Sequence, residues 1–199
     1  MIVIMPCDMS EERKQMIRAF GAEIVDVGPG DFAGAVVKRT ELIEQYNAFC
    51  PKQFSNSDNI ACHRETTGAE ILQQVSALTP SVQISAFAAG TGTGGTLMGV
   101  REALVPVLPN IDIIAVEPTE SAVMSGGESG PHSIQGIGDG FIPDIVDMEK
   151  VNLVAAVSSE QAIARTKRLT RELGLFVGIS AGANVAAAGT SRSAGTGMF

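Results

Sequence analysis

Short apolar runs rich in β-branched residues alternate along the chain with stretches in which apolar residues recur every three or four positions. The runs predict strands, and the stretches predict amphipathic helices that bury one side. The predicted strands cover residues 2–5, 22–27, 82–89, 111–116, 151–157 and 175–179. Because strands and helices alternate, the sequence predicts an α/β fold with mainly parallel sheets.

Polar residues and glycines mark the ends of the predicted helices. The predicted N-caps are Ser10, Thr67 with Glu70, and Ser158 with Gln161, and the predicted C-terminal stops are Gly21 and Gly174. One helix, after the turn at residues 28–31, has an apolar stripe that predicts core contacts, formed by Phe32, Val36, Ile43 and Tyr46.

A polar, punctuated stretch at residues 50–59 predicts a crossing between two subdomains. We expect a partial small subdomain at 1–49, a large ligand-binding subdomain at 50–188 and a tail at 189–199. The tail is predicted to be disordered because its glycine, serine and threonine residues offer little to pack.

Composition narrows the class of protein. The 199 residues are 45% hydrophobic, which is enough for a core, and 14 basic against 22 acidic residues give a net charge of −8. That charge disfavours nucleic acid and anionic membrane surfaces as partners. The sequence has no apolar stretch long enough to span a bilayer and no secretory leader, so we expect a soluble, cytoplasmic protein. Three cysteines without CxxC spacing and two histidines favour neither a disulfide framework nor a metal site.

The strongest chemical signal is the heptapeptide Gly90-Thr91-Gly92-Thr93-Gly94-Gly95-Thr96, between a predicted strand and a predicted helix. Backbone N–H groups and a helix N-terminus converge there, a setting that binds anions, and the threonine hydroxyls suit a terminal phosphate. Two other interpretations stay open. The segment is a tight turn that binds nothing, or its GxGxxG spacing with Glu117 after the next strand marks a nicotinamide dinucleotide site.

A second motif, Gly178-Ile179-Ser180-Ala181-Gly182, has the GxSxG form of a hydrolase nucleophile. A hydrolase also needs an acid and a histidine after the serine, and residues 181–199 contain no Asp, Glu or His. Ser180 is therefore expected either to offer its hydroxyl to a ligand at the end of a strand or to serve as a plain helix cap. We assign no role to His63 or His132, because neither has a partner that spacing identifies.

Nine segments between residues 2 and 188 carry a resemblance to a known family. The segments are Met5-Pro6, Met9-Ser10-Glu11-Glu12-Arg13, Gly21-Ala22-Glu23, Gln53-Phe54-Ser55-Asn56, Thr66-Thr67-Gly68-Ala69-Glu70-Ile71, Gly92-Thr93-Gly94-Gly95-Thr96, Val116-Glu117-Pro118-Thr119, Ile134-Gln135-Gly136-Ile137-Gly138 with Phe141-Ile142-Pro143, and Gly178-Ile179-Ser180-Ala181-Gly182. Taken together and in this order, they resemble cysteine synthase (O-acetylserine sulfhydrylase), a fold type II pyridoxal phosphate enzyme family that includes cystathionine β-synthase.

The resemblance implies a tryptophan synthase β-like fold, with twisted, mainly parallel sheets covered by helices on both faces. It implies pyridoxal 5′-phosphate as cofactor, and replacement of the acetoxy group of O-acetylserine by sulfide to make cysteine. By the same resemblance Gly92, Thr93, Gly94, Gly95 and Thr96 would cup the cofactor phosphate, and Ser180 would hydrogen-bond the pyridine nitrogen. Gln53 would hold the substrate carboxylate and Gly136 would line the pocket. A homodimer and a complex with serine acetyltransferase are also implied.

The sequence departs from the family at both ends. The family's Schiff-base lysine and an Asn-containing substrate loop belong to a section before the strand at Ile2, and the family's final helix continues where this sequence has its tail. None of Lys14, Lys38, Lys52, Lys150 and Lys167 matches the lysine motif, and Lys14, Lys38 and Lys167 are expected on exposed helix faces. We therefore assign no catalytic residue and expect an incomplete, truncated enzyme. The alternatives are a catalytically dead binding protein and an NAD-dependent oxidoreductase.

Overall fold

The computed structural model describes residues 1–78 and 84–191. The chain divides into two units, one ending at Pro51 and one beginning at Lys52. Two sequence predictions extend beyond these ranges. The start of the strand predicted at 82–89 and residues 192–199 of the predicted tail lie outside the described residues. Each unit is described below by itself.

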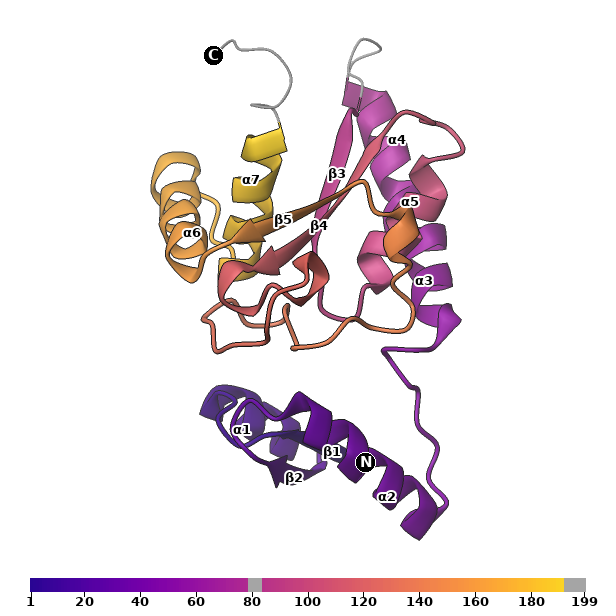
Figure 1. Ribbon diagram of the computed structural model, residues 1–199, viewed down its shortest axis with the longest axis vertical. Helices are drawn as coiled ribbons and strands as arrows, with labels where there is room; N and C mark the ends of the chain where they lie inside the picture. The colour runs from indigo at the N-terminus through magenta and orange to yellow at the C-terminus, as the bar shows by residue number, and fades with distance from the viewer. Residues whose placement is uncertain (79–83, 192–199) are drawn as a thin grey trace. The chain divides into compact units, whose positions relative to one another are not determined.

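The first unit is a pair of parallel strands with two helices (Figure 1). Its elements are β1 (Ile2–Pro6), α1 (Glu11–Ala19), β2 (Glu23–Val27) and α2 (Phe32–Tyr46). Ile2 of β1 lies opposite Glu23 of β2, and the register continues to Pro6 opposite Val27. Gly21 ends α1 with a φ of 77°, a conformation that glycine adopts without a Cβ penalty. Both strands and both helices are where the sequence predicted them.

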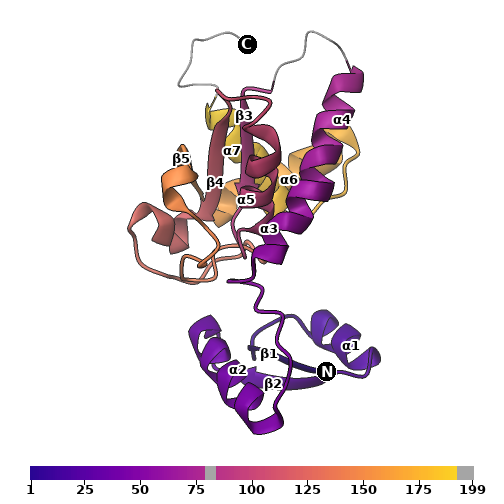
Figure 2. The ribbon, with the colours of Figure 1, turned by 90° about the vertical axis from the view of Figure 1, so that its right-hand side faces the viewer.

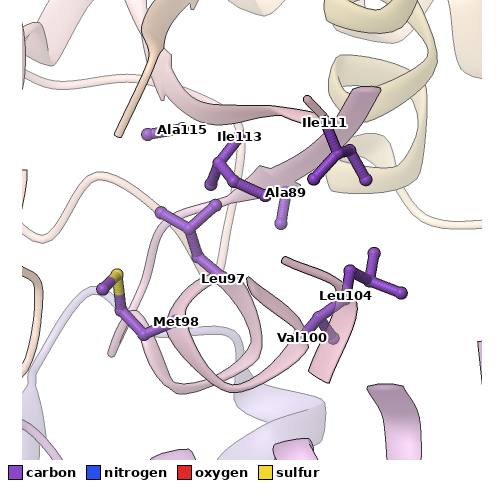
Figure 3. Close-up of a cluster of buried hydrophobic side chains, with 8 residues drawn as sticks. All are labelled: Ala89, Leu97, Met98, Val100, Leu104, Ile111, Ile113 and Ala115. Carbon is purple, nitrogen blue, oxygen red and sulfur yellow. The ribbon is translucent and has the colours of Figure 1, made fainter. Parts of the chain in front are cut away.

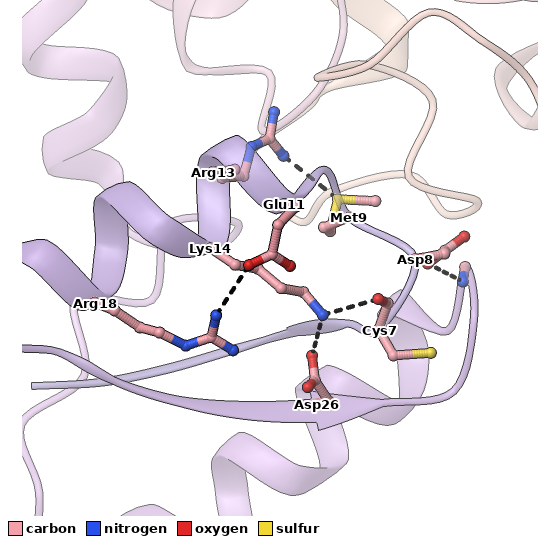
Figure 4. A network of polar contacts seen from close by, with 9 residues as sticks. Cys7, Asp8, Met9, Glu11, Arg13, Lys14, Arg18 and Asp26 are labelled. Carbon is pink, nitrogen blue, oxygen red and sulfur yellow. Dashed lines mark hydrogen bonds and ion pairs between the residues drawn. The ribbon is translucent and has the colours of Figure 1, made fainter.

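Two burial predictions for this unit are wrong. Phe32, Val36 and Ile43 of the predicted stripe are half-buried, but Tyr46, predicted with them to contact a core, is 59% exposed, and no residue of α2 is fully buried. A two-stranded sheet offers too little apolar surface to cover a 15-residue helix. Lys14, predicted on an exposed face of α1, is instead 7% exposed. Its ammonium group donates to Asp26 Oδ1 at 2.7 Å and to the carbonyl oxygen of Cys7 at 2.8 Å (Figure 4).

The second unit is a three-layered arrangement around a parallel sheet of order β3-β4-β5 (Figures 1 and 2). One side of the sheet carries α3, α4 and α5, and the other carries α6 and α7. The elements are α3 (Ser57–His63), a π-helical turn (Arg64–Gly68), α4 (Ala69–Leu78), β3 (Ala86–Gly90), α5 (Gly95–Leu104), β4 (Asp112–Pro118), three 3-10 turns (Thr119–Ser121, Val123–Ser125, Met148–Lys150), β5 (Leu153–Val157), α6 (Ser159–Leu173) and α7 (Ile179–Ser191).

The core of this unit lies on both faces of the sheet, because alternate residues of β4 point to opposite sides. Ile113 and Ala115 join the face covered by α5, where Leu97, Val100 and Leu104 are completely buried (Figure 3). On the other face Val116 packs with two alanines of α7, Ala183 and Ala187. The predicted stripe of α5 is confirmed, and so is the predicted cap of α6, where Ser158 and Gln161 form a reciprocal capping box.

The predicted cap at Thr67 and Glu70 is wrong. Thr67 lies inside a continuous helical run that begins at Ser57, ten residues earlier, and passes through the π-helical turn. The side chain of Asn56 caps this run by accepting the N–H of Asp58 at 2.9 Å. Gly68 of the turn packs so closely on α5 that a Cβ there would lie 2.4 Å from Cβ of Ala103. Packing against α5 therefore overrides the local capping signal.

The strand predicted at 175–179 is also absent from the described residues. Residues 174–178 are irregular, and the helix α7 begins at Ile179. The N–H of Leu175 donates to Leu169 and its carbonyl accepts from the Thr170 hydroxyl, so its backbone is used by the end of α6. Phe176 is 95% exposed. At the other end of α7, the predicted tail begins too early, because the helix continues to Ser191.

Candidate functional site

The heptapeptide at 90–96 links the carboxyl end of β3 to the first turn of α5, as its sequence context predicts. Thr91 fixes its position: its N–H donates to the Val116 carbonyl of β4 at 2.9 Å, and its carbonyl accepts the N–H of Gly138 at 3.1 Å. The loop is therefore tied both to the central strand and to the glycine-rich segment around residue 136. In α/β proteins ligands bind at this end of the strands.

Three glycines let neighbouring segments approach the loop where no side chain would fit. A Cβ on Gly92 would lie 2.5 Å from the carbonyl oxygen of Gly136. Gly94 has a φ of 85°, and a Cβ there would meet Cγ2 of Val146. A Cβ on Gly95 would overlap the amide of Asn59. These approaches hold the main chain of the loop close to three neighbouring segments at the start of α5.

The main chain of this loop has donors to offer a ligand. The N–H groups of Gly92, Thr93, Gly94 and Thr96 donate to no atom in the part of the chain that the structure describes. Gly94 stands immediately before the first residue of α5, where the positive end of the helix dipole lies. Unused N–H groups at a helix N-terminus bind an anion well, and a phosphate group fits this donor set.

Sequence reasoning missed Asn59, which connects the loop to Gln53. One Nδ2 hydrogen goes to the hydroxyl oxygen of Thr93 at 3.0 Å and the other to the carbonyl oxygen of Gln53 at 2.9 Å. The side chain of Gln53 is exposed and forms no hydrogen bond within the described ranges. Asn59 is 34 residues from Thr93, so no local pattern points to the contact.

Aromatic packing brings a further predicted segment to the same place. The rings of Phe54 and Phe141 meet edge to face, with centroids 5.0 Å apart. Phe54 follows Gln53, and Phe141 closes the glycine-rich segment that contains Gly136. Together with the Asn59 bridge and the close approach of Gly92 to Gly136, this contact gathers Gln53, Gly136 and the loop at 92–96 at one end of the sheet.

Ser180 lies in the first turn of α7, and no hydrogen bond joins it to the loop within residues 1–78 and 84–191. Asn184, one turn further along the same helix, does approach the loop. Its Oδ1 atom is buried without a hydrogen-bond partner among the described residues and would lie 3.2 Å from a Cβ placed on Gly90. This face of α7 therefore lies against the start of the loop, and residues four apart share a helix face.

Two acidic side chains lie at and after the end of β4, Glu117 within the strand and Asp139 in the segment that follows it. Glu117 is 1% exposed, and its carboxylate accepts the N–H groups of Met124 and Ser125 at 2.8 and 3.0 Å as well as the Ser125 hydroxyl. These hydrogen bonds hold the start of the segment against the strand. Burial raises the pKa of the Asp139 carboxyl, an effect that nearby His132 partly opposes.

Both histidines, left without a role by the sequence, have partners in the structure. His132 accepts the N–H of Ile134 at Nδ1, so its Nε2 carries the proton that it donates to the Gly138 carbonyl at 3.1 Å. His63 contacts the hydroxyl groups of Thr67 and Thr96. Among the described residues no cluster of histidine, cysteine and acidic side chains could hold a metal ion. The same residues contain no helix of sufficient length and apolarity to cross a membrane.

Known proteins match this chain over most of its length. Residues 1–196 match the family described as pyridoxal-phosphate dependent enzyme. A cysteine synthase of Staphylococcus aureus is 45% identical over 189 residues, which are 94% of this chain and 59% of that protein. The chain belongs to the pyridoxal-phosphate dependent enzyme family. The cofactor that the resemblance implied is thus the cofactor of its family.

Solved structures of the family share the fold of this chain. A hydrogen sulfide-producing enzyme from Fusobacterium nucleatum has a TM-score of 0.89 at 38% identity, covering 96% of this chain and 58% of that one. A cysteine synthase from Entamoeba histolytica has a TM-score of 0.82 at 36% identity, covering 92% and 54%. These matches confirm the predicted fold class. The chain spans about three fifths of the length of the relatives it matches.

Three lysines of the chain form ion pairs with carboxylates in the structure. Lys14 is buried against Asp26, Lys38 pairs with Glu41 at 2.8 Å, and Lys150 pairs with Asp147 at 2.8 Å. None of these lies in the loop at 92–96, and we assign a Schiff-base role to no lysine of this chain.

Proposed function

We propose that this chain forms the phosphate cradle of a cysteine synthase, an enzyme that replaces the acetoxy group of O-acetylserine with sulfide. The observation that carries the proposal is the loop at 92–96, where unused N–H groups and threonine hydroxyls converge at the N-terminus of α5. The family match and the 45% identity to a cysteine synthase support the same activity. Pyridoxal 5′-phosphate, when bound, would act as an electron sink for the amino-acid substrate.

The roles proposed for individual residues follow from what each can offer. Gly92 to Thr96 hold the phosphate through N–H groups, and the hydroxyl of Ser180 hydrogen-bonds the pyridine nitrogen. A neutral hydroxyl leaves that nitrogen largely unprotonated, which suits loss of a good leaving group from the β carbon. Gln53, whose side chain is exposed and uncommitted, holds the substrate carboxylate, and the backbone at Gly136 lines the pocket.

Cofactor binding by the full chain tests the cradle directly. We expect pyridoxal 5′-phosphate to protect the chain against thermal unfolding, NAD to give no protection, and inorganic phosphate to compete. Gly94→Ala should abolish binding, because the new Cβ would meet Val146 at a φ of 85°. Gly126→Ala is the matched control, since Gly126 has a φ of 83° in the same unit but nothing within 4 Å of its Cβ position. Protection by NAD alone would contradict the proposal and favour an oxidoreductase.

The same proposal extends to assembly and location. We propose a cytoplasmic homodimer that binds serine acetyltransferase, the partner that the resemblance implies, through the C-terminal tail of that partner. A peptide of that tail should be retained by the wild-type chain and lost from Gln53→Ala and Thr93→Val variants. Retention by neither wild type nor variants would remove this partner while leaving the cofactor proposal standing.

Borohydride treatment with bound cofactor should label no lysine of the chain.

A further inference from the structure

His63 joins the candidate phosphate loop to the π-helical turn. Its Nε2 atom lies 3.2 Å from the hydroxyl oxygen of Thr96, the last residue of the loop, and its Nδ1 atom lies 2.9 Å from the hydroxyl oxygen of Thr67 in the turn. Its Cβ is held against α5, because a Cβ on Gly99 would lie 2.6 Å from it. The imidazole is therefore fixed between two hydroxyl groups from different elements.

The protons of this chain of contacts can be arranged in two ways, because a neutral imidazole has one donor and one acceptor. In the first, Thr67 donates to Nδ1 and Nε2–H donates to Thr96, so the Thr96 proton is free to point to a ligand. In the second, Nδ1–H donates to Thr67, and Thr96 gives its proton to Nε2. Only the first arrangement lets the Thr96 hydroxyl donate to an anion in the loop.

The charged side chains on the π-helical turn and on the adjoining part of α5 favour neither proton arrangement, because each has a partner of its own. On the π-helical turn, Arg64 pairs with Glu65 at 2.9 Å and with Glu102 of α5 at 3.1 Å. Arg101, the neighbour of Glu102 on α5, donates to the carbonyl oxygen of Lys150 at 3.2 Å. These four charged side chains are thus paired with each other or with main chain, and the choice rests on the hydroxyl contacts.

We infer that His63 is a positioning residue of the phosphate cradle, whose Nε2–H tautomer orients the hydroxyl proton of Thr96 toward the bound phosphate. This inference rests on the proposed function, because it requires a phosphate group in the loop at 92–96. By the same coupling, the bound phosphate selects that tautomer, and Thr67 in the π-helical turn supports it by donating to Nδ1. His63 itself contacts no ligand.

Nitrogen NMR of the full chain labelled at histidine observes the tautomer directly. The chain has two histidines, so a His132→Gln variant assigns the His63 signals. At about pH 8, above the ordinary pKa of a histidine side chain, we expect inorganic phosphate to shift His63 to a protonated Nε2 and an unprotonated Nδ1. A His63 that keeps a protonated Nδ1 with phosphate bound would overturn the inference. Failure of phosphate and of pyridoxal 5′-phosphate to bind at all overturns the proposed function with it.

Substitution separates positioning from a structural role. His63→Leu should lower the affinity for pyridoxal 5′-phosphate about tenfold and leave the affinity for pyridoxal, which has no phosphate, unchanged. His63→Gln should retain most of the affinity, because its amide nitrogen can donate to Thr96 in place of Nε2–H. Thr67→Val, which removes the donor to Nδ1, should weaken phosphate-dependent binding in the same direction and by less.

Two results would contradict the inference while the proposed function stands. One is wild-type affinity for both ligands in His63→Leu and Thr67→Val. The other is an equal loss for pyridoxal and its phosphate, which would show a structural role only. If His63→Leu does not fold, the tautomer of the unaltered chain and the Thr67→Val affinities still decide the question.

Discussion

The two units of this chain are built from the same alternation of strand and helix, yet they hold together differently. Among the described residues, the buried apolar side chains of the first unit are those of Met5, Pro6 and Ala22, whereas the second unit has clusters on both faces of its sheet. The first unit relies more on a polar anchor, the buried Lys14 with Asp26 and Cys7. The comparison teaches that a sheet needs a central strand before helices on its two faces can bury their apolar sides. In the second unit β4 is that strand, and the candidate site lies at its end.

The largest loss of stability is expected from a substitution in the apolar core of the second unit. Leu97→Ala removes a completely buried side chain beside Ile113 and should destabilise the unit by about 2–5 kcal/mol. Ile43→Ala in α2, where no residue is fully buried, should cost about 1 kcal/mol. Hydrogen exchange measured on peptides from each unit distinguishes the two. Equal losses of protection in both units would contradict the comparison.

The next largest loss of stability is expected at the polar anchor of the first unit, formed by Lys14 with Asp26 and Cys7. Lys14→Met keeps the aliphatic stem but leaves Asp26 and the Cys7 carbonyl without their donor, and should cost the first unit about 1–3 kcal/mol. Lys38→Met is the matched control, because its pair with Glu41 is exposed, and it should change stability by less than about 0.5 kcal/mol. Hydrogen exchange in α1 and α2 at increasing urea concentration measures both changes. A Lys14→Met variant as stable as wild type would show that apolar contacts alone are enough to hold the first unit together.

A pair of serines, one in each unit, allows a finer comparison. The Ser158 hydroxyl accepts the N–H of Gln161 and caps α6, so Ser158→Ala should destabilise α6 by about 1 kcal/mol. Ser10 occupies the same position before α1, but its side chain forms no capping hydrogen bond. Ser10→Ala should therefore be nearly neutral, with a change of at most about 0.3 kcal/mol. Exchange rates in the first turns of α1 and α6 check both values, and equal losses would contradict the difference.

The smallest effect concerns pH and the segment after β4. The pKa of Asp139 is raised by burial, so its ionised form is less favourable in the folded chain than in the unfolded one. The stability this group contributes is present below its unfolded pKa of about 3.9 and is lost as pH rises through its higher folded pKa. Asp139→Asn should therefore melt slightly above wild type at neutral pH and alike at about pH 3. A difference that stays constant with pH would contradict this sign.

The sequence was most reliable where the signal is local. The strand, the loop at 90–96 and α5 could be predicted because the glycines and the apolar stripe stand next to each other. The strand at 175–179 could not be excluded, because its apolar residues resemble a buried strand and only the absence of a paired neighbour in the described sheet decides against it. For Lys14, helical spacing alone could not reveal a carboxylate on the adjacent strand.

The missed residues of the candidate site have a common cause. Asn59 reaches Thr93 across 34 residues, and His63 reaches Thr96 across 33. Both lie on α3, the first part of the helical run that the sequence predicted to begin only at Thr67, because Thr67 and Glu70 look like a capping box. Contacts of this kind depend on the packing of α3 against α5, shown by the close approach of Gly99 to Ile60 and His63. Spacing along one chain does not encode them.

The π-helical turn at residues 64–68 marks a place where this helix can lose a residue. A π turn holds one more residue than an α turn, so removing one residue there would leave an unbroken α-helix. The shortened turn would still complete one revolution, so the residues after the deletion would keep their orientation around the helix axis. Ile71 and Leu72, which now pack on the core, would stay packed on it. We therefore expect homologous chains that lack one residue at this turn to keep the same packing between this helix and the core.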